Sequence, residues 1–171
     1  SNEGAIKFFL LGVLSASLIL YGFSLLYGLT GNILFTEIST FIVQNSLGSS
    51  PVLLLSSILV IAGLGFKISV APFHSWAPDT YEGAPLPVTA YLSVSSKATG
   101  FVALIILLTS LYTASSYGWG VILAIISGVT MTLGNLVALQ QTNPVRLLAY
   151  SSIAQAGFVL APIAVSGITQ N

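Results

Sequence analysis

Two lysines, Lys67 and Lys97, lie inside long apolar stretches of this sequence, where an amine can act as a proton carrier. A lysine at mid-membrane costs roughly 2.5–3.5 kcal/mol on insertion scales, so such residues usually face a bundle interior or water and mark ion pathways. Lys97 follows Pro87 by ten residues, which is about 15 Å along a helix. Lys67 follows Pro51 by sixteen residues and precedes Pro72 by five, so it also falls near mid-membrane. Because desolvation and neighbouring cations disfavour the charged amine, both lysines could exchange protons near neutral pH.

Polar residues near these lysines could support proton exchange. His74 follows Lys67 by seven residues, close to two helical turns, and an imidazole titrates near neutral pH. Its alternative role is to tie down a free carbonyl at a helix break. Ser93 lies one turn before Lys97, and Ser96 is adjacent to it. We expect these serines to solvate the ammonium; the alternative for Lys97 is helix packing against a carboxylate.

Three further charged residues have a simpler interpretation. Lys7 lies near the start of the first apolar run, where lysines often anchor the topology of a membrane protein. Asp79 and Glu82 flank Tyr81 in a more polar stretch, where they could cap helix termini or face water. From position alone, we expect a structural role for both carboxylates.

The composition indicates a protein that lives in a membrane. Of 171 residues, 55% are hydrophobic and only 5% are charged, whereas a soluble domain carries about 25% charged residues. A formal net charge of zero leaves no basic patch for nucleic acid, so we expect none to bind. Zero cysteines exclude thiolate metal sites and Cys-ligated clusters in this stretch, and no metal-ligand spacing or nucleophile–base pair suggests hydrolysis.

The apolar runs predict an all-α, polytopic transmembrane bundle of about five spans. One crossing needs roughly 20 residues, and the second run is far longer, so we expect a discontinuous helix broken near residues 72–78 by Pro72 and Pro78. Residues 32–50 are polar enough to be an extramembrane connection. The predicted spans cover residues 5–27, 51–82, 87–112, 118–139 and 144–166.

The order of the spans also predicts an orientation. Counting crossings places Lys7, the 83–87 turn and the 140–146 loop on one side of the membrane. Lys7 and Arg146 make that side cytoplasmic, or matrix, by the positive-inside rule. The chain begins at Ser1 without a signal peptide, and we expect residues 1–171 to be an internal fragment of one transmembrane domain.

The run GFKISVAPFHSWAPDTYEGAPLPV at residues 65–88 resembles the core of the antiporter-like membrane-arm subunits of complex I. Residues 7–12, 134–136 and 146–153 resemble the same family in the same order. The pattern around Lys67, with Ser-Ser-Lys at 95–97, is most similar to the quinone-side subunit, called N in bacteria, 2 in mitochondria and B in plastids. The larger subunits and the related Mrp-type sodium/proton antiporters tend to have histidine at position 97.

This resemblance implies that the chain supplies the sixth to tenth of about fourteen helices, with the second of them discontinuous. In the family, a lysine that pairs with a glutamate of helix five begins a proton path, which lysines in helices seven, eight and twelve continue. Lys7, Lys67 and Lys97 stand at the first three positions, with His74 between the latter two and with Ser93, Ser96 and Tyr150 as supporting polar groups.

The implied function is proton translocation by a non-redox subunit of a NADH:quinone oxidoreductase. Quinone, NADH, flavin and iron–sulfur clusters are then expected in other subunits, with none bound by this chain. The expected partners are the other membrane-arm subunits, the lipid bilayer, and water and protons. The expected location is the bacterial plasma membrane, or the mitochondrial inner or thylakoid membrane. The alternatives are a subunit of a multi-subunit Na⁺/H⁺ antiporter and a scaffold whose lysines only fix helix packing.

Overall fold

The computed structural model describes residues 2–111, 115 and 118–169, and these residues form helices without a strand. The predicted all-α bundle with one discontinuous helix is therefore confirmed. In chain order the elements are α1 (Asn2–Thr30), α2 (Phe35–Gln44), the 3₁₀ turn η1 (Leu47–Ser49), α3 (Pro51–Ile68), α4 (Trp76–Gly83), α5 (Leu86–Tyr91), the π-helical turn η2 (Leu92–Ser96), α6 (Lys97–Ser110), α7 (Trp119–Ala138) and α8 (Pro144–Thr169).

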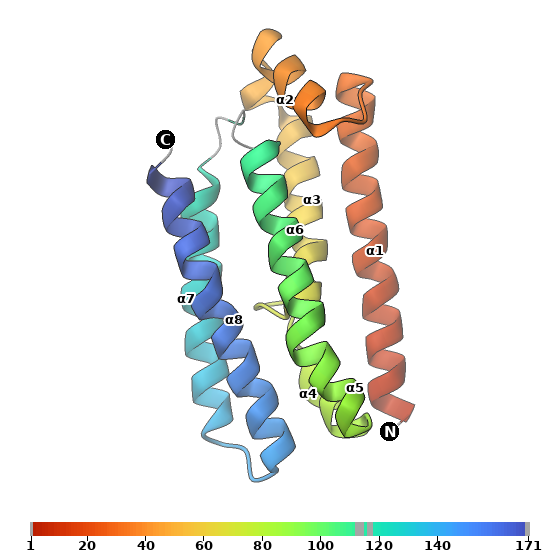
Figure 1. The fold of residues 1–171 in the computed structure, drawn as a ribbon, viewed down its shortest axis with the longest axis vertical. Helices are drawn as coiled ribbons and strands as arrows, with labels where there is room; N and C mark the ends of the chain where they lie inside the picture. The colour runs from red at the N-terminus through yellow and green to blue at the C-terminus, as the bar shows by residue number, and fades with distance from the viewer. Residues whose placement is uncertain (1, 112–114, 116–117, 170–171) are drawn as a thin grey trace.

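Five of the helical segments are long and apolar enough to cross a membrane. They are α1, α3, the continuous run of α5, η2 and α6, then α7 and the part of α8 up to Gly167. The long helices stand side by side, and the N-terminus, the α4–α5 turn and the α7–α8 loop lie at one end of the bundle (Figure 1). We call this the N-terminal end; the crossing count predicts the same grouping. Residue 112, the expected end of the third span, lies outside the described residues.

The discontinuous helix breaks earlier than the prolines suggest. Helix α3 ends at Ile68, and Ser69 takes a left-handed conformation with φ of 58°. The interruption runs from residue 69 to residue 75, so Pro72 lies within it. Pro78 does not, and its predicted place is corrected: it lies in the first turn of α4. A proline is tolerated there because the first N–H groups of a helix have no intrahelical acceptor.

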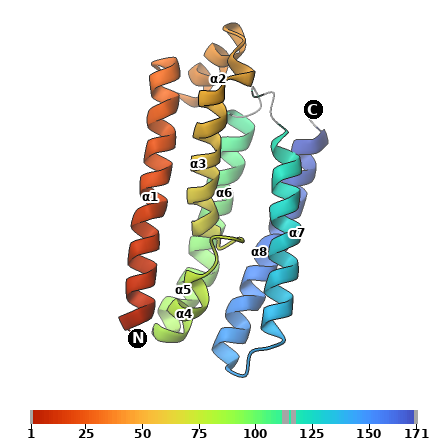
Figure 2. The same ribbon diagram turned by 180° about the vertical axis from the view of Figure 1, so that it is seen from behind.

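The interrupted segment extends from α3 toward α7 (Figure 2), and some of the backbone groups freed by the break have hydrogen-bond partners. The backbone N–H of Ala71 donates to Thr130 Oγ1 of α7 at 3.0 Å. The carbonyl of Phe66 accepts from the backbone N–H of Ser69 at 3.1 Å and from Trp76 Nε1 at 3.0 Å. Irregular backbone at membrane depth needs such protein partners, and here α7 and the indole supply them.

The predicted extramembrane connection contains a short helix. In α2, Ile38 and Ile42 are buried in the apolar core while Glu37 on the opposite face is exposed. This helix packs against α1 and α6 at the end of the bundle remote from the N-terminus (Figure 1). It is too short to cross a membrane, which requires about 20 residues.

Small residues bring α1 and α3 into close contact. Ser15 Oγ of α1 donates to the carbonyl of Gly63 at 2.8 Å, and Ser56 Oγ of α3 donates to the carbonyl of Gly22 at 2.9 Å. Each helix therefore presents a serine to a glycine of the other. A serine–glycine contact of the same kind joins α7 and α8, where Ser127 Oγ donates to the carbonyl of Gly157 at 2.7 Å. Small residues at such interfaces let backbones approach without a hydrophobic driving force.

Candidate functional site

Lys97 is buried at mid-span, with 5% of its surface exposed. Its Nζ donates to the hydroxyl of Ser152 at 2.7 Å and to the backbone carbonyl of Ser152 at 3.0 Å. Within the described residues no carboxylate forms an ion pair with Lys97. In the described structure the amine of Lys97 is therefore held by two neutral oxygens of Ser152 and faces no opposite charge.

The hydrogen bonds of Lys97 differ from those predicted. Ser93 Oγ donates instead to the carbonyl of Ala90 at 3.0 Å, and Ser96 makes no hydrogen bond to Lys97 in the described structure. The partner, Ser152, lies 55 residues away on α8, so sequence spacing could not identify it. A hollow of about 410 Å³ opens between the α5–η2 segment and α8, and both Ser93 and Ser152 line it.

A π-helical turn leads directly into Lys97. The turn η2, residues Leu92–Ser96, holds one extra residue relative to an α-helix and ends where α6 begins at Lys97. Such π turns are frequent at functional sites because they redirect a side chain. Nothing in the local sequence signals it, since neither proline nor glycine falls within residues 92–96.

Lys67 lies in the last turn of α3, at the carbonyl end of the interrupted helix. Its side chain is exposed and has no ion pair among the described residues. The partial negative charge at a helix C-terminus favours a cation there. Helix α6 passes α3 at this level, because a Cβ on Gly100 would lie 2.6 Å from Ile68 Cγ2 and 3.4 Å from Lys67 Cβ. Lys97 is one turn before Gly100, so the structure brings the two lysine-bearing segments together.

His74 lies within the interruption and is half-buried. The helical geometry that would put it on one face with Lys67 is absent, because α3 ends at Ile68. Its Nδ1 is buried without a hydrogen-bond partner in the described part of the chain. A carbonyl tied down through Nδ1 is therefore not what the structure shows, and the role of His74 in proton exchange stays a prediction.

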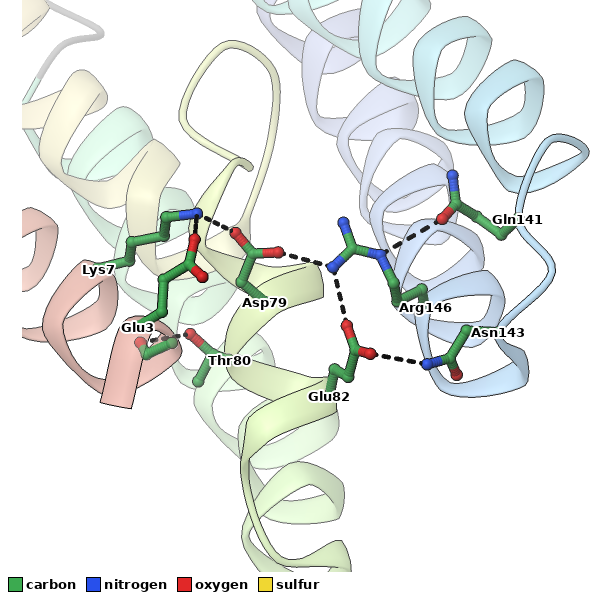
Figure 3. Close-up of polar contacts among 9 residues, drawn as sticks. Glu3, Lys7, Asp79, Thr80, Glu82, Gln141, Asn143 and Arg146 are labelled. Atoms are coloured by element: carbon green, nitrogen blue, oxygen red, sulfur yellow. Dashed lines mark hydrogen bonds and ion pairs between the residues drawn. The ribbon is translucent and has the colours of Figure 1, made fainter. Parts of the chain in front are cut away.

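Lys7 belongs to a row of charges at the N-terminal end of the bundle (Figure 3). Its Nζ lies 2.6 Å from Glu3 Oε1 and 2.6 Å from Asp79 Oδ2. Asp79 Oδ1 lies 2.7 Å from Arg146 Nη1, which also contacts Glu82 Oε2 at 2.9 Å. We call these five residues the charge row; it joins α1, α4 and α8.

Polar neighbours extend and position the charge row. Asn143 donates to Glu82 at 2.8 Å, and Arg146 donates to Gln141 at 3.4 Å. The predicted supporting residue Tyr150 packs half-buried against the cluster that contains Phe66 and Trp76. Asp79 and Glu82, expected to be structural, thus connect three helices that are far apart in sequence.

A bundle of five apolar spans, one of them continued by an interrupted helix, defines an integral, multi-pass membrane protein. The chain belongs to the family described as NADH:quinone oxidoreductase/Mrp antiporter, TM, which it matches over residues 1–171.

Individual relatives agree with the family. NADH-quinone oxidoreductase subunit N of Desulforamulus reducens is 48% identical over 160 residues, covering 94% of this chain and 33% of that protein. Among solved structures, a chain of respiratory complex I from Thermus thermophilus with bound aureothin is 39% identical with a TM-score of 0.75, covering 99% of this chain and 34% of that one. A chain of the Mrp complex from Dietzia sp. shares the fold at 23% identity, with a TM-score of 0.82 over 98% of this chain and 32% of that one. The chain spans about a third of the length of the curated relatives that it matches.

Proposed function

We propose that this chain is part of the N-type, proton-translocating membrane subunit of a NADH:quinone oxidoreductase. The 48% identity to a subunit N supports this assignment, as does lysine rather than histidine at position 97. The subunit couples quinone reduction in other subunits to proton movement. NADH, flavin, iron–sulfur clusters and quinone are bound elsewhere in the complex, and the partners are the other membrane-arm subunits and the lipid bilayer. The membrane is the bacterial plasma membrane, or its mitochondrial or thylakoid counterpart.

The observation that carries the proposal is the environment of Lys97. Lys97 is buried, and its hydrogen bonds in the described structure go to Ser152 and not to a carboxylate, whereas the helix terminus at Lys67 favours a cation. Protons then pass between Lys67 and Lys97 through water, with His74 as an intermediate. Lys7 acts at a distance, because its positive charge repels a cation at Lys67.

Replacing Lys67 tests this function in the assembled complex. Lys67→Ala should abolish or sharply cut proton translocation and the coupled quinone reduction, measured in closed membrane vesicles. Glu37→Gln is the control, since Glu37 is an exposed charge on α2, at the end of the bundle remote from the N-terminus and away from the mid-depth lysines. Unchanged proton translocation in Lys67→Ala would contradict the role of this lysine.

A subunit of a multi-subunit Na⁺/H⁺ antiporter is the second candidate, because the Mrp complex shares the fold. It predicts sodium-dependent proton movement in vesicles without any quinone reductase activity. Proton movement that depends on quinone reduction and not on sodium would exclude it.

A further inference from the structure

We propose that Asp79 is a positioning residue of the proton path. It offers Lys7 a second carboxylate beside Glu3, and so decides how strongly the charge of Lys7 acts on Lys67. This inference rests on the proposed function. It arises from the placement of Asp79 at the centre of the charge row, with Lys7 on one oxygen at 2.6 Å and Arg146 on the other at 2.7 Å.

Asp79 is the most buried member of the charge row. Its side chain is 22% exposed, against 42% for Lys7 and 30% for Arg146. A carboxylate in such a place is destabilised if a single cationic partner leaves. Arg146 prevents this, because it holds Asp79 and Glu82 together. Lys7 can therefore leave Asp79 for another carboxylate while the partly buried Asp79 keeps Arg146 as its cationic partner.

The contact between α1 and α4 fixes where Lys7 and Asp79 meet. A Cβ on Gly4 would lie 2.6 Å from the backbone oxygen of Asp79, so only glycine permits this approach. Thr80 Oγ1 also donates to the carbonyl of Gly4 at 3.3 Å. The two backbones are therefore held together independently of the ion pair, and the Lys7 side chain is free to change partners while they stay in contact.

Asp79 is also linked to the interrupted helix through Trp76, which is three residues before it on α4. Trp76 is 1% exposed, and its Nε1 donates to the carbonyl of Phe66, the residue before Lys67. Its ring lies 5.2 Å from the ring of Phe8, the residue after Lys7. Helix α4 thus carries contacts from the charge row to the backbone at Lys67.

A purely structural charge row would predict something different. If its ion pairs only fasten α1, α4 and α8 together, neutralising Asp79 would reduce the amount of assembled complex and leave proton translocation per quinone unchanged. If Asp79 acts through Lys7, neutralising it would change that ratio in normally assembled complex. Its effect would also require Lys7 to be present.

The test is a double-mutant cycle in the complete protein within its native complex. The variants are Asp79→Asn, Lys7→Gln, the double variant, and Asp79→Glu. We measure assembly, quinone reduction and protons moved per quinone in vesicles. We expect Asp79→Asn to lower the proton ratio at least about threefold, because a neighbouring opposite charge changes proton affinity by about tenfold or more. It should have no further effect in the Lys7→Gln background, and Asp79→Glu should restore most of the ratio.

Two results would overturn the inference: a normal proton ratio in Asp79→Asn, or an equal loss with and without Lys7. If Asp79→Asn does not assemble, Lys7→Arg decides, because a guanidinium binds a carboxylate more firmly while keeping the charge. A lowered ratio in Lys7→Arg supports the exchange of partners, and a normal ratio contradicts it. If Lys67→Ala loses proton translocation while Asp79→Asn keeps a normal proton ratio, this inference alone is rejected. Normal proton translocation in Lys67→Ala would reject the proposed function.

Discussion

The charges at the N-terminal end of the bundle and those at its middle have opposite surroundings. At the end, every member of the charge row contacts a residue of opposite sign at 2.6–2.9 Å. At the middle, Lys97 has only Ser152, and Lys67 has no ion pair in the described part of the chain. Helix α4 joins the two regions. It carries Asp79 in the charge row, and its Trp76 donates a hydrogen bond to the carbonyl of Phe66, the residue before Lys67.

This difference separates charges that stabilise the fold from charges that serve proton translocation. Partly exposed ion pairs contribute little individually, about 0–1 kcal/mol, but they form readily where water is near. An unpaired lysine at mid-membrane is a net cost, so stability does not explain it. The middle lysines are therefore the residues whose loss should affect function most and folding least.

Replacing Lys97 with methionine should give a functional effect comparable to that of Lys67→Ala. Methionine has a similar length and no charge, so the complex should assemble at normal or raised levels. Proton translocation should fall by about a hundredfold, the order contributed by a positioned proton carrier. The measurement is proton movement in vesicles, normalised to the amount of assembled complex. Normal proton movement in Lys97→Met would favour the scaffold interpretation instead.

Enlarging Gly100 should separate the two middle lysines. Because a Cβ at Gly100 already meets Ile68, Gly100→Leu should push α6 from α3 and cost about 1–3 kcal/mol by overpacking. We expect proton translocation per assembled complex to drop severalfold. Gly128→Leu on α7 is the matched control, since apart from the adjacent backbone of α7 no described atom lies within 4 Å of a Cβ there. Equal losses in both variants would show that the α3–α6 approach has no special role.

Much of this architecture could be predicted from composition and prolines. Apolar length determines the spans because one crossing needs about 20 residues, and the overlong second run required a break. The exact break depended on Ser69, a non-glycine residue with φ of 58°, and on Trp76, whose indole satisfies the carbonyl of Phe66. Prolines alone placed it too late, because Pro78 suits a first helical turn equally well.

The candidate site was predictable only in part. Lys67 and Lys97 stand out because charge is rare in this sequence, and depth follows from counting residues. Ser152 and the partners of Lys7 come from helices distant in sequence, and the order of spans does not say which faces meet. The π turn before Lys97 depends on tertiary packing, so local propensity could not reveal it.

Removing the hydroxyl of Ser152 should have a moderate effect. Ser152→Ala keeps the backbone carbonyl contact to Lys97 and loses the 2.7 Å contact. A hydrogen bond to a charged group contributes about 1.5–3 kcal/mol, so proton translocation should change by about fivefold or more, with assembly unaffected. Ser151→Ala is the control, because Ser151 lines the same hollow and makes no hydrogen bond to Lys97 in the described structure. Equal effects of the two variants would assign the change to the hollow and not to Lys97.

Neutralising Glu82 should have the smallest effect. Glu82 is 42% exposed; it contacts Arg146 Nη1, the atom that also contacts Asp79, and forms no ion pair with Lys7 in the described structure. Glu82→Gln should therefore destabilise the complex by about 0.5 kcal/mol and leave the proton ratio unchanged, because Arg146 still holds Asp79. The thermal unfolding midpoint of the assembled complex, compared with Glu37→Gln, measures the first quantity, and vesicle assays measure the second. A lowered proton ratio in Glu82→Gln would mean that the whole charge row, and not Asp79 alone, controls Lys7.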